Sequence, residues 1–355
     1  MPQRLSNFGM KNYGTRISWA LFALLLSLHA AAAETSETAD TTETSETSAE
    51  SFDACDAERG GQPFQEKTRE TFRSWSCHSF RWFDGLWGDS HDFDEDAVRG
   101  WFIAGAEYTE YDDFDPRLRV RVRAPLPNMD RRLDLIVGRV DETTYVTDTA
   151  GEDLDFFNPG VVNQRDQEPE WLLGLGHRSR NRRSGWDWDA GVRLRVPPRP
   201  YTKLQYYYNK AFSENTDFHF RQTFFWRSDD GFGTTSRGEF THAFNPSDML
   251  RTEAIASLSE DTEGTEWYFG QTWYHRLEGD NAISLRAFVS GATDHPVQLR
   301  EYGLNLVWRR PFTREWLYLS LGPSVTWPRE LVSEEREMSL GFGAWIEVEF
   351  GDWRY

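Results

Sequence analysis

Residues 339–350 read SLGFGAWIEVEF, a stretch in which apolar and non-apolar side chains alternate. One parity holds Leu340, Phe342, Ala344, Ile346, Val348 and Phe350, and the other holds Ser339, Gly341, Gly343, Glu347 and Glu349. Successive side chains of a β-strand point to opposite faces. The stretch therefore predicts a strand with one apolar face and one face of small or charged residues, as is expected where a strand separates lipid from water.

The start of the 355-residue chain is typical of a secretory signal. Basic residues precede a short apolar run over 17–28, and small residues follow over 30–33. We predict a signal peptide over 1–33 that is cleaved near Ala33. A membrane anchor is the alternative, but the run is shorter than the roughly 20 residues of a spanning helix. No later stretch reaches that length, which excludes a helical membrane protein.

Two segments separate the signal from the rest of the chain. Residues 34–52 repeat Glu, Thr and Ser, and this composition predicts a disordered acidic linker. Residues 53–96 carry aromatic side chains at roughly helical spacing and form an N-terminal segment, either a plug inside a barrel or a periplasmic cap. Cys55 and Cys77 lie in it, and export to an oxidising compartment predicts a disulfide between them, with free thiols as the alternative.

The net charge of the chain is −19, which argues against nucleic acid as a partner. No zinc-ligand spacing, phosphate-binding glycine loop or haem attachment motif occurs, so the sequence implies no cofactor and no metal.

From residue 97 to 355 the chain is a series of short alternating runs that end in turn residues. The predicted strands are 98–111, 116–125, 131–141, 169–180, 185–196, 201–212, 217–228, 233–244, 249–259, 264–277, 281–292, 297–309, 314–327 and 337–350. The fold class is all-β, a transmembrane antiparallel meander barrel of about fourteen strands, with twelve or sixteen as alternatives. In 217–228 the residue Gln222 breaks the apolar face, and the parity of 267–275 can be assigned either way.

A soluble sandwich also has alternating strands, and strand length argues against it here. The predicted strands run for about 11 to 14 residues, whereas strands of soluble proteins cluster near 5 or 6. Aromatic residues lie near the ends of the runs, as in the interfacial girdles of membrane barrels. The predicted girdle residues are Tyr108, Tyr111, Tyr201, Trp226, Trp267, Trp308, Trp316 and Trp327.

The signal, the meander of amphipathic strands and the apolar alternation of the last strand resemble Gram-negative outer-membrane barrel proteins. The resemblance covers residues 98–350 and implies an outer-membrane location, contact with outer-membrane lipid and insertion by the barrel assembly machinery. In that class the last strand carries an assembly signal, which Gly343 to Phe350 resembles. The five residues after Phe350 depart from the pattern, since such chains usually end on an aromatic residue of the strand.

The inward parity of the strands carries the residues that we predict to line the lumen. They are Arg119, Arg121, Arg123, Arg193, Arg195, His219, Arg221, Arg227, Arg251, Arg286, Glu239, Glu253, Glu266, Glu347 and Glu349. A basic wall beside acidic residues can create a transverse field that favours anions. Alternatively, these charges pair with one another and fill the lumen. The acidic connection 142–168 could bind cations or fold over the mouth.

His177 and Ser179 resemble the His-x-Ser signature of outer-membrane phospholipase A and lipid A deacylase, in which the histidine activates the serine. The match covers three residues, and no orienting acid shares their predicted face. An interfacial polar pair at a strand end is the favoured interpretation.

The sequence thus predicts a non-enzymatic outer-membrane barrel, either a narrow passive channel for small solutes, including anionic ones, or a structural envelope protein. The alternatives are a lipid hydrolase that uses His177 and Ser179, and a barrel that docks a periplasmic partner through residues 53–96.

Overall fold

The structure is a computed structural model, and it describes residues 98–126, 130–140, 143–149, 170–179, 181, 183–278 and 281–350. The predicted signal peptide, the linker, the segment 53–96 and the pair Cys55 and Cys77 lie outside these residues. The described part of the chain contains no helix with the length and apolar character of a membrane span.

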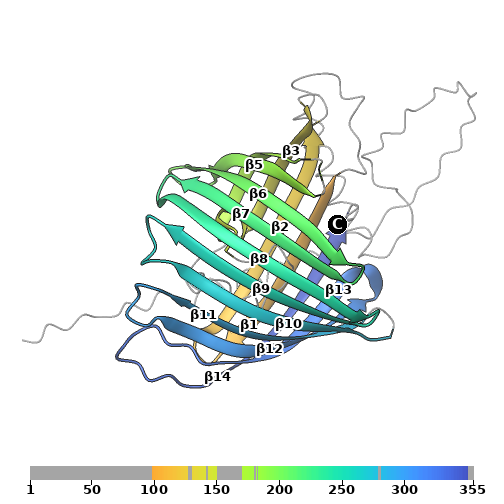
Figure 1. Ribbon diagram of the computed structural model, residues 1–355, viewed down its shortest axis with the longest axis vertical. Helices are drawn as coiled ribbons and strands as arrows, with labels where there is room; N and C mark the ends of the chain where they lie inside the picture. The colour runs from red at the N-terminus through yellow and green to blue at the C-terminus, as the bar shows by residue number, and fades with distance from the viewer. Residues whose placement is uncertain are drawn as a thin grey trace, which may run out of the picture. The chain divides into compact units, whose positions relative to one another are not determined.

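Fourteen antiparallel strands form one closed barrel, as the alternation predicted (Figure 1). The strands are β1 (Arg99–Thr109), β2 (Asp113–Leu126), β3 (Asp130–Val140), β4 (Glu170–His177), β5 (Ser184–Arg193), β6 (Arg199–Ser213), β7 (Thr216–Arg227), β8 (Gly231–Asn245), β9 (Asp248–Ser259), β10 (Glu266–Arg276), β11 (Ala282–Ala292), β12 (Leu299–Phe312), β13 (Arg314–Thr326) and β14 (Ser339–Phe350). Each strand pairs with its neighbours in sequence, and β1 pairs with β14 from Gly100 opposite Phe350 to Thr109 opposite Gly341. The closing stretch of the sequence therefore leaves no free edge.

The two ends of the barrel differ in their connections. At one end, which we call the long-loop end, lie the connection between β3 and β4 and the twelve-residue connection 327–338 between β13 and β14. At the other, the short-turn end, β6 joins β7 through residues 214–215 and β8 joins β9 through 246–247. The first residue of β1 and the last of β14 also lie at the short-turn end.

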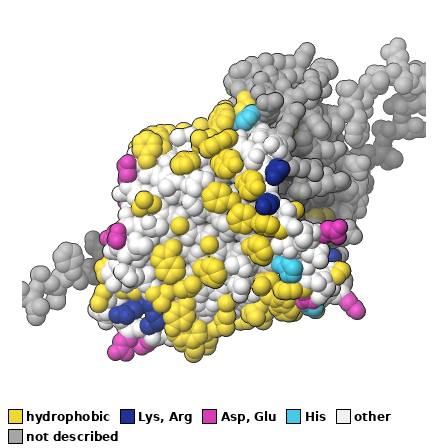
Figure 2. Space-filling model, in the orientation of Figure 1, with side chains coloured by type: hydrophobic (Ala, Val, Ile, Leu, Met, Phe, Trp, Pro, Cys, Tyr) yellow, Lys and Arg dark blue, Asp and Glu magenta, His cyan; other side chains and the backbone are white. Residues whose placement is uncertain are grey.

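The outer wall of the barrel is mainly apolar. Outward-facing side chains such as Phe269, Leu285 and Leu304 are 46%, 42% and 45% exposed, whereas their inward neighbours Arg286 and Asn305 are buried. Figure 2 shows hydrophobic side chains spread over the visible wall, with the charged groups near its margins. A wall of this kind meets hydrocarbon, and polar groups are kept on the inner face.

Two predicted girdle residues do not belong to the outer wall. Tyr201 lies opposite Gly191 and Arg227 on the inner face and is 2% exposed, so its assignment to a girdle is wrong. Trp316 shares the inward parity of Tyr318, which pairs with Glu347. Run ends alone do not reveal which face an aromatic residue occupies.

Candidate functional site

The inner face of the barrel carries most of the charged residues that parity singled out. Arg119, Arg121 and Arg123 lie on β2, Arg193 on β5, His219, Arg221 and Arg227 on β7, Glu239 on β8, Arg251 and Glu253 on β9, Glu266 on β10, Arg286 on β11 and Glu347 on β14. Glu349 occupies the strand position paired with Trp101. Arg195 lies past the end of β5 at the long-loop end, where its guanidinium is 3.1 Å from the carboxylate of Glu170.

A short π-helix, η4 (Thr143–Thr147), lies inside the barrel against β6, β7 and β8. It belongs to the connection that we predicted to bind cations or to cover the mouth. The Nζ of Lys203 donates a 2.7 Å hydrogen bond to the carbonyl of Tyr145 and lies 4.0 Å from the centre of its ring. From β2, the guanidinium of Arg121 lies 4.8 Å from the same ring. The wall therefore holds Tyr145 by cation–π contacts as well as by a hydrogen bond.

Glycines on β4 and β5 make room for the aromatic side chains beside η4. A Cβ on Gly174 would lie 2.6 Å from the Tyr201 hydroxyl, and one on Gly191 would lie 2.7 Å from it. The rings of Tyr201 and Tyr145 meet edge to face with their centres 6.1 Å apart. The small residues of these strands thus leave room for the Tyr201 side chain at the inner wall, where Tyr145 packs against it edge to face.

Asp148, directly after η4, holds the connection against β7. Its carboxylate is 3.3 Å from Nε of Arg221 and accepts a 2.9 Å hydrogen bond from the Thr223 hydroxyl. Asp148 is 1% exposed, so its carboxylate is shielded from bulk water, whereas Arg221 is partly exposed. The sequence offered no periodic signal for Tyr145 or Asp148, because they lie in a connection between strands.

Lys203 and Asp189 form a buried ion pair that the sequence analysis missed. Their charged atoms are 3.2 Å apart, and both side chains are buried. Both residues have the inward parity of their strands, which is the signal that would have found them.

Acidic and basic side chains alternate along β8 and β9 toward the short-turn end. Arg237 lies 2.6 Å from Glu239 and 2.5 Å from Glu253, and Arg251 lies 2.9 Å from Glu239. On β14, Glu347 accepts hydrogen bonds from Arg309 and from the indole of Trp345, each at 2.9 Å. These acids therefore lie in local pairs with arginines.

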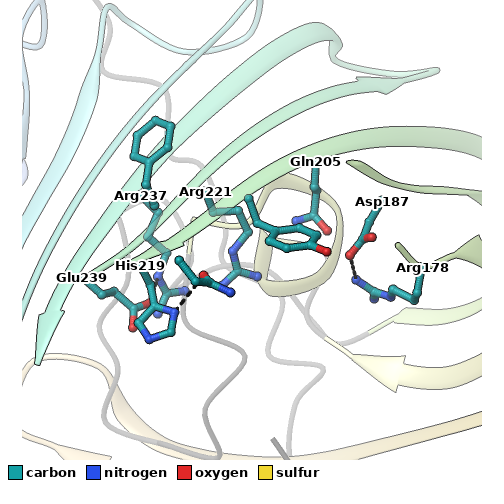
Figure 3. Close-up of a pocket in the computed structure, with 10 residues that line it drawn as sticks. Arg178, Asp187, Gln205, His219, Arg221, Arg237 and Glu239 are labelled. Carbon is teal, nitrogen blue, oxygen red and sulfur yellow. Dashed lines mark hydrogen bonds and ion pairs between the residues drawn. The ribbon is translucent and has the colours of Figure 1, made fainter. Parts of the chain in front are cut away.

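A cavity of about 230 Å³ opens between β5 and β8 on the short-turn side of η4; we call it the β6–β8 cavity. Figure 3 shows the labelled side chains projecting from the wall, with Arg178 and Asp187 at one end and His219 and Glu239 at the other. Arg221 lies between these ends, Arg237 lies beside Glu239 on β8, and Gln205, Tyr207 and Asn209 complete the described wall. This cavity combines charges of both signs with hydrogen-bonding amides.

The long-loop end carries a separate ion-pair network. The carboxylate of Asp229, in the turn between β7 and β8, is paired with Arg193 and lies 2.5 Å from Arg199. Burial alone would raise the pKa of Asp229, but the charge of Arg193 and the hydrogen bonds from both arginines hold that pKa below its usual range. The turn is thus tied to β5 and β6.

His177 and Ser179 lie in different surroundings. The His177 ring is stacked on Trp188 of β5, with ring centres 6.2 Å apart. The Ser179 hydroxyl lies on the inner side of the wall, because it is next to Gly185, where an added Cβ would be 2.4 Å from it. The hydroxyl accepts a hydrogen bond from the backbone N–H of Asn181. The Ser179 amide donates to Asp187. In this arrangement the histidine is not placed to activate the serine.

The closed antiparallel barrel and its apolar outer wall confirm the general class, an outer-membrane β-barrel protein. No protein-family model matches the chain, and no curated protein sequence matches it.

Among solved structures, the barrel is similar to OprD of Pseudomonas aeruginosa (10% identity, TM-score 0.42, covering 73% of this chain and 96% of that one). It is also similar to the outer-membrane channel DcaP of Acinetobacter baumannii (7%, 0.44, covering 71% and 96%) and to an anion-selective porin from Comamonas acidovorans (9%, 0.41, covering 71% and 99%). With identities and scores this low, the class rests on the protein's own strand pairing and surface.

Proposed function

We propose that the protein is a narrow passive channel of the outer membrane that admits small solutes and favours anions. The observation that carries this proposal is the position of η4, which lies within the barrel and is held there by Lys203, Arg121 and the pair formed by Asp148 and Arg221. A segment fixed inside a barrel narrows the lumen, and cations on the wall beside it lower the energy of an anion that passes.

In this proposal the short-turn end faces the periplasm and the long-loop end faces the exterior, because barrels of this class have short periplasmic turns. The chain would reach the membrane through a signal peptide cleaved near Ala33. We also retain two predictions for the N-terminal segment: a disulfide between Cys55 and Cys77, and a periplasmic partner for residues 53–96. Within the part of the chain that the structure describes, no contact of His177 or Ser179 favours the hydrolase alternative.

Planar-bilayer recording of the full mature chain tests the channel. We expect discrete conductance steps and, under a KCl gradient, a reversal potential of the sign set by chloride. Arg121→Gln should move that potential toward zero, because it removes one cation beside η4. The absence of any conductance from correctly folded protein would overturn the channel proposal. A reversal potential of the sign set by potassium would overturn the anion preference.

A further inference from the structure

The β6–β8 cavity presents ionic groups of both signs. Among the residues that the structure describes, ion pairs at and beside it join Arg178 to Asp187, Arg221 to Asp148, and Arg237 and Arg251 to Glu239 and Glu253. A ligand that brings one charge of each sign can meet both an arginine and a carboxylate of this wall.

Arg237 marks where the negative group of a ligand would lie. Its side chain is 2% exposed and lines the cavity. Nη1 of this guanidinium has no hydrogen-bond partner among the residues that the structure describes. A buried guanidinium donor is best satisfied by a carboxylate oxygen. Arg221, also at the wall, adds a second positive charge near the same place.

Glu239 supplies the place for a positive group. Its carboxylate forms ion pairs with Arg237 and Arg251, and Figure 3 shows it at the end of the cavity beside His219. A carboxylate has about four acceptor positions, so it can take an ammonium in addition to the two arginines. Gln205 and Asn209 place amide groups along the remaining wall.

We propose that the β6–β8 cavity is a binding site for a small zwitterion of the α-amino acid type. The carboxylate lies on Arg237 and Arg221, the ammonium on Glu239, and a polar side chain along Gln205 and Asn209. The volume of about 230 Å³ is below the range typical of drug-sized ligands and suits a single amino acid. The proposal deepens the proposed channel function, on which it rests for the solute's route to the cavity.

Calorimetric titration of the full chain in detergent tests the site with three probes of similar size. L-glutamine is the zwitterion, glutaramate lacks the ammonium, and 4-aminobutanamide lacks the carboxylate. L-glutamine should bind at least about tenfold more tightly than either, the factor expected for one charge-assisted hydrogen bond. Glutaramate binding as tightly as L-glutamine would overturn the proposal in favour of a simple anion site, and the absence of binding by all three would overturn it outright.

Two variants separate binding from folding. Arg237→Lys keeps the positive charge between Glu239 and Glu253 but removes the planar donor, and it should weaken L-glutamine binding about tenfold. Arg310→Lys, on the outward face of β12, is the matched control and should leave binding unchanged. If Arg237→Lys fails to fold, the double variant Arg237→Gln/Glu253→Gln, which removes a charge of each sign, takes its place. Unchanged binding by the folded variant contradicts the assignment of Arg237.

Conductance distinguishes this proposal from the channel itself. L-glutamine binding without any ion conductance would leave the site in place and overturn the channel. Conductance without L-glutamine binding would leave the channel in place and overturn the site.

Discussion

At the scale of single residues, Lys203 decides how η4 is held. Its ammonium contacts the Tyr145 carbonyl, the face of the Tyr145 ring and the carboxylate of Asp189. A buried lysine is tolerated only when its charge is compensated in this way. The same side chain therefore joins the strand wall, the π-helix and the neighbouring strand β5.

Replacing Lys203 with methionine should loosen η4 and destabilise the barrel. The variant keeps the length of the side chain but leaves Asp189 buried without its cation, at a cost of about 3 kcal/mol in the free energy of unfolding. We expect a larger and noisier single-channel conductance together with a lower urea midpoint. The double variant Lys203→Met/Asp189→Asn should recover most of the stability and keep the altered conductance. Lys210→Met, on the outward face of β6, is the control; equal losses in both single variants would contradict the role of Lys203.

At the scale of elements, the turn between β7 and β8 is fastened by Asp229. Because its pKa is lowered in the folded protein, the Asp229 pairs stabilise the fold fully above the unfolded pKa of 3.8. That contribution is lost as the pH falls through the folded pKa, which lies below 3.8. The pairs are partly exposed, so their contribution is about 1 kcal/mol at most.

Urea unfolding of the parent protein and of Asp229→Asn, measured from pH 7 down to pH 2, tests the contribution of the Asp229 ion pairs. The parent should be more stable by about 1 kcal/mol at pH 7, and the difference should vanish in the acid range. Ser228→Ala, in the same turn, removes a side chain that does not titrate in this range and should show no pH-dependent difference. A constant difference at every pH would mean that the Asp229 side chain acts through packing and not through its charge.

The elements also show what the sequence could reveal. The alternation of apolar and polar side chains located all fourteen strands, because each strand has one apolar outer face and one polar inner face. It placed the arginines of β2 on the inner side for the same reason. It could not locate η4, since Tyr145 and Asp148 are held by contacts to residues 58 and 75 positions away, and no local pattern encodes such partners. Tyr201 was wrongly predicted to belong to a girdle because it lies near the end of an alternating run. Its ring lies inside the barrel, where glycines on other strands make room for it.

At the scale of the whole molecule, the barrel separates two environments across a single layer of sheet. The closing strand β14 shows this in one segment, since Ile346 faces outward at 39% exposure while Glu347 is 2% exposed and bound to Arg309. Several of the described charges on the inner face lie in ion pairs, among them Lys203 with Asp189 and Arg237 with Glu239. The lumen therefore carries local sites of both signs and is not uniformly basic. Selectivity should therefore depend on position along the lumen.

The assignment of outside and inside predicts opposite effects for the same substitution at neighbouring positions. On β11, Leu285 faces outward and Ser284 faces the lumen at nearly the same depth. Leu285→Arg should destabilise the barrel in vesicles by about 2 kcal/mol, because an arginine on the lipid face must leave water. Ser284→Arg should change the free energy of unfolding by less than about 1 kcal/mol, since its charge enters a polar lumen. Urea titration of refolding into phosphatidylcholine vesicles measures both values. Equal costs at the two positions, or a larger cost at Ser284, would mean that the wall does not separate lipid from water as described.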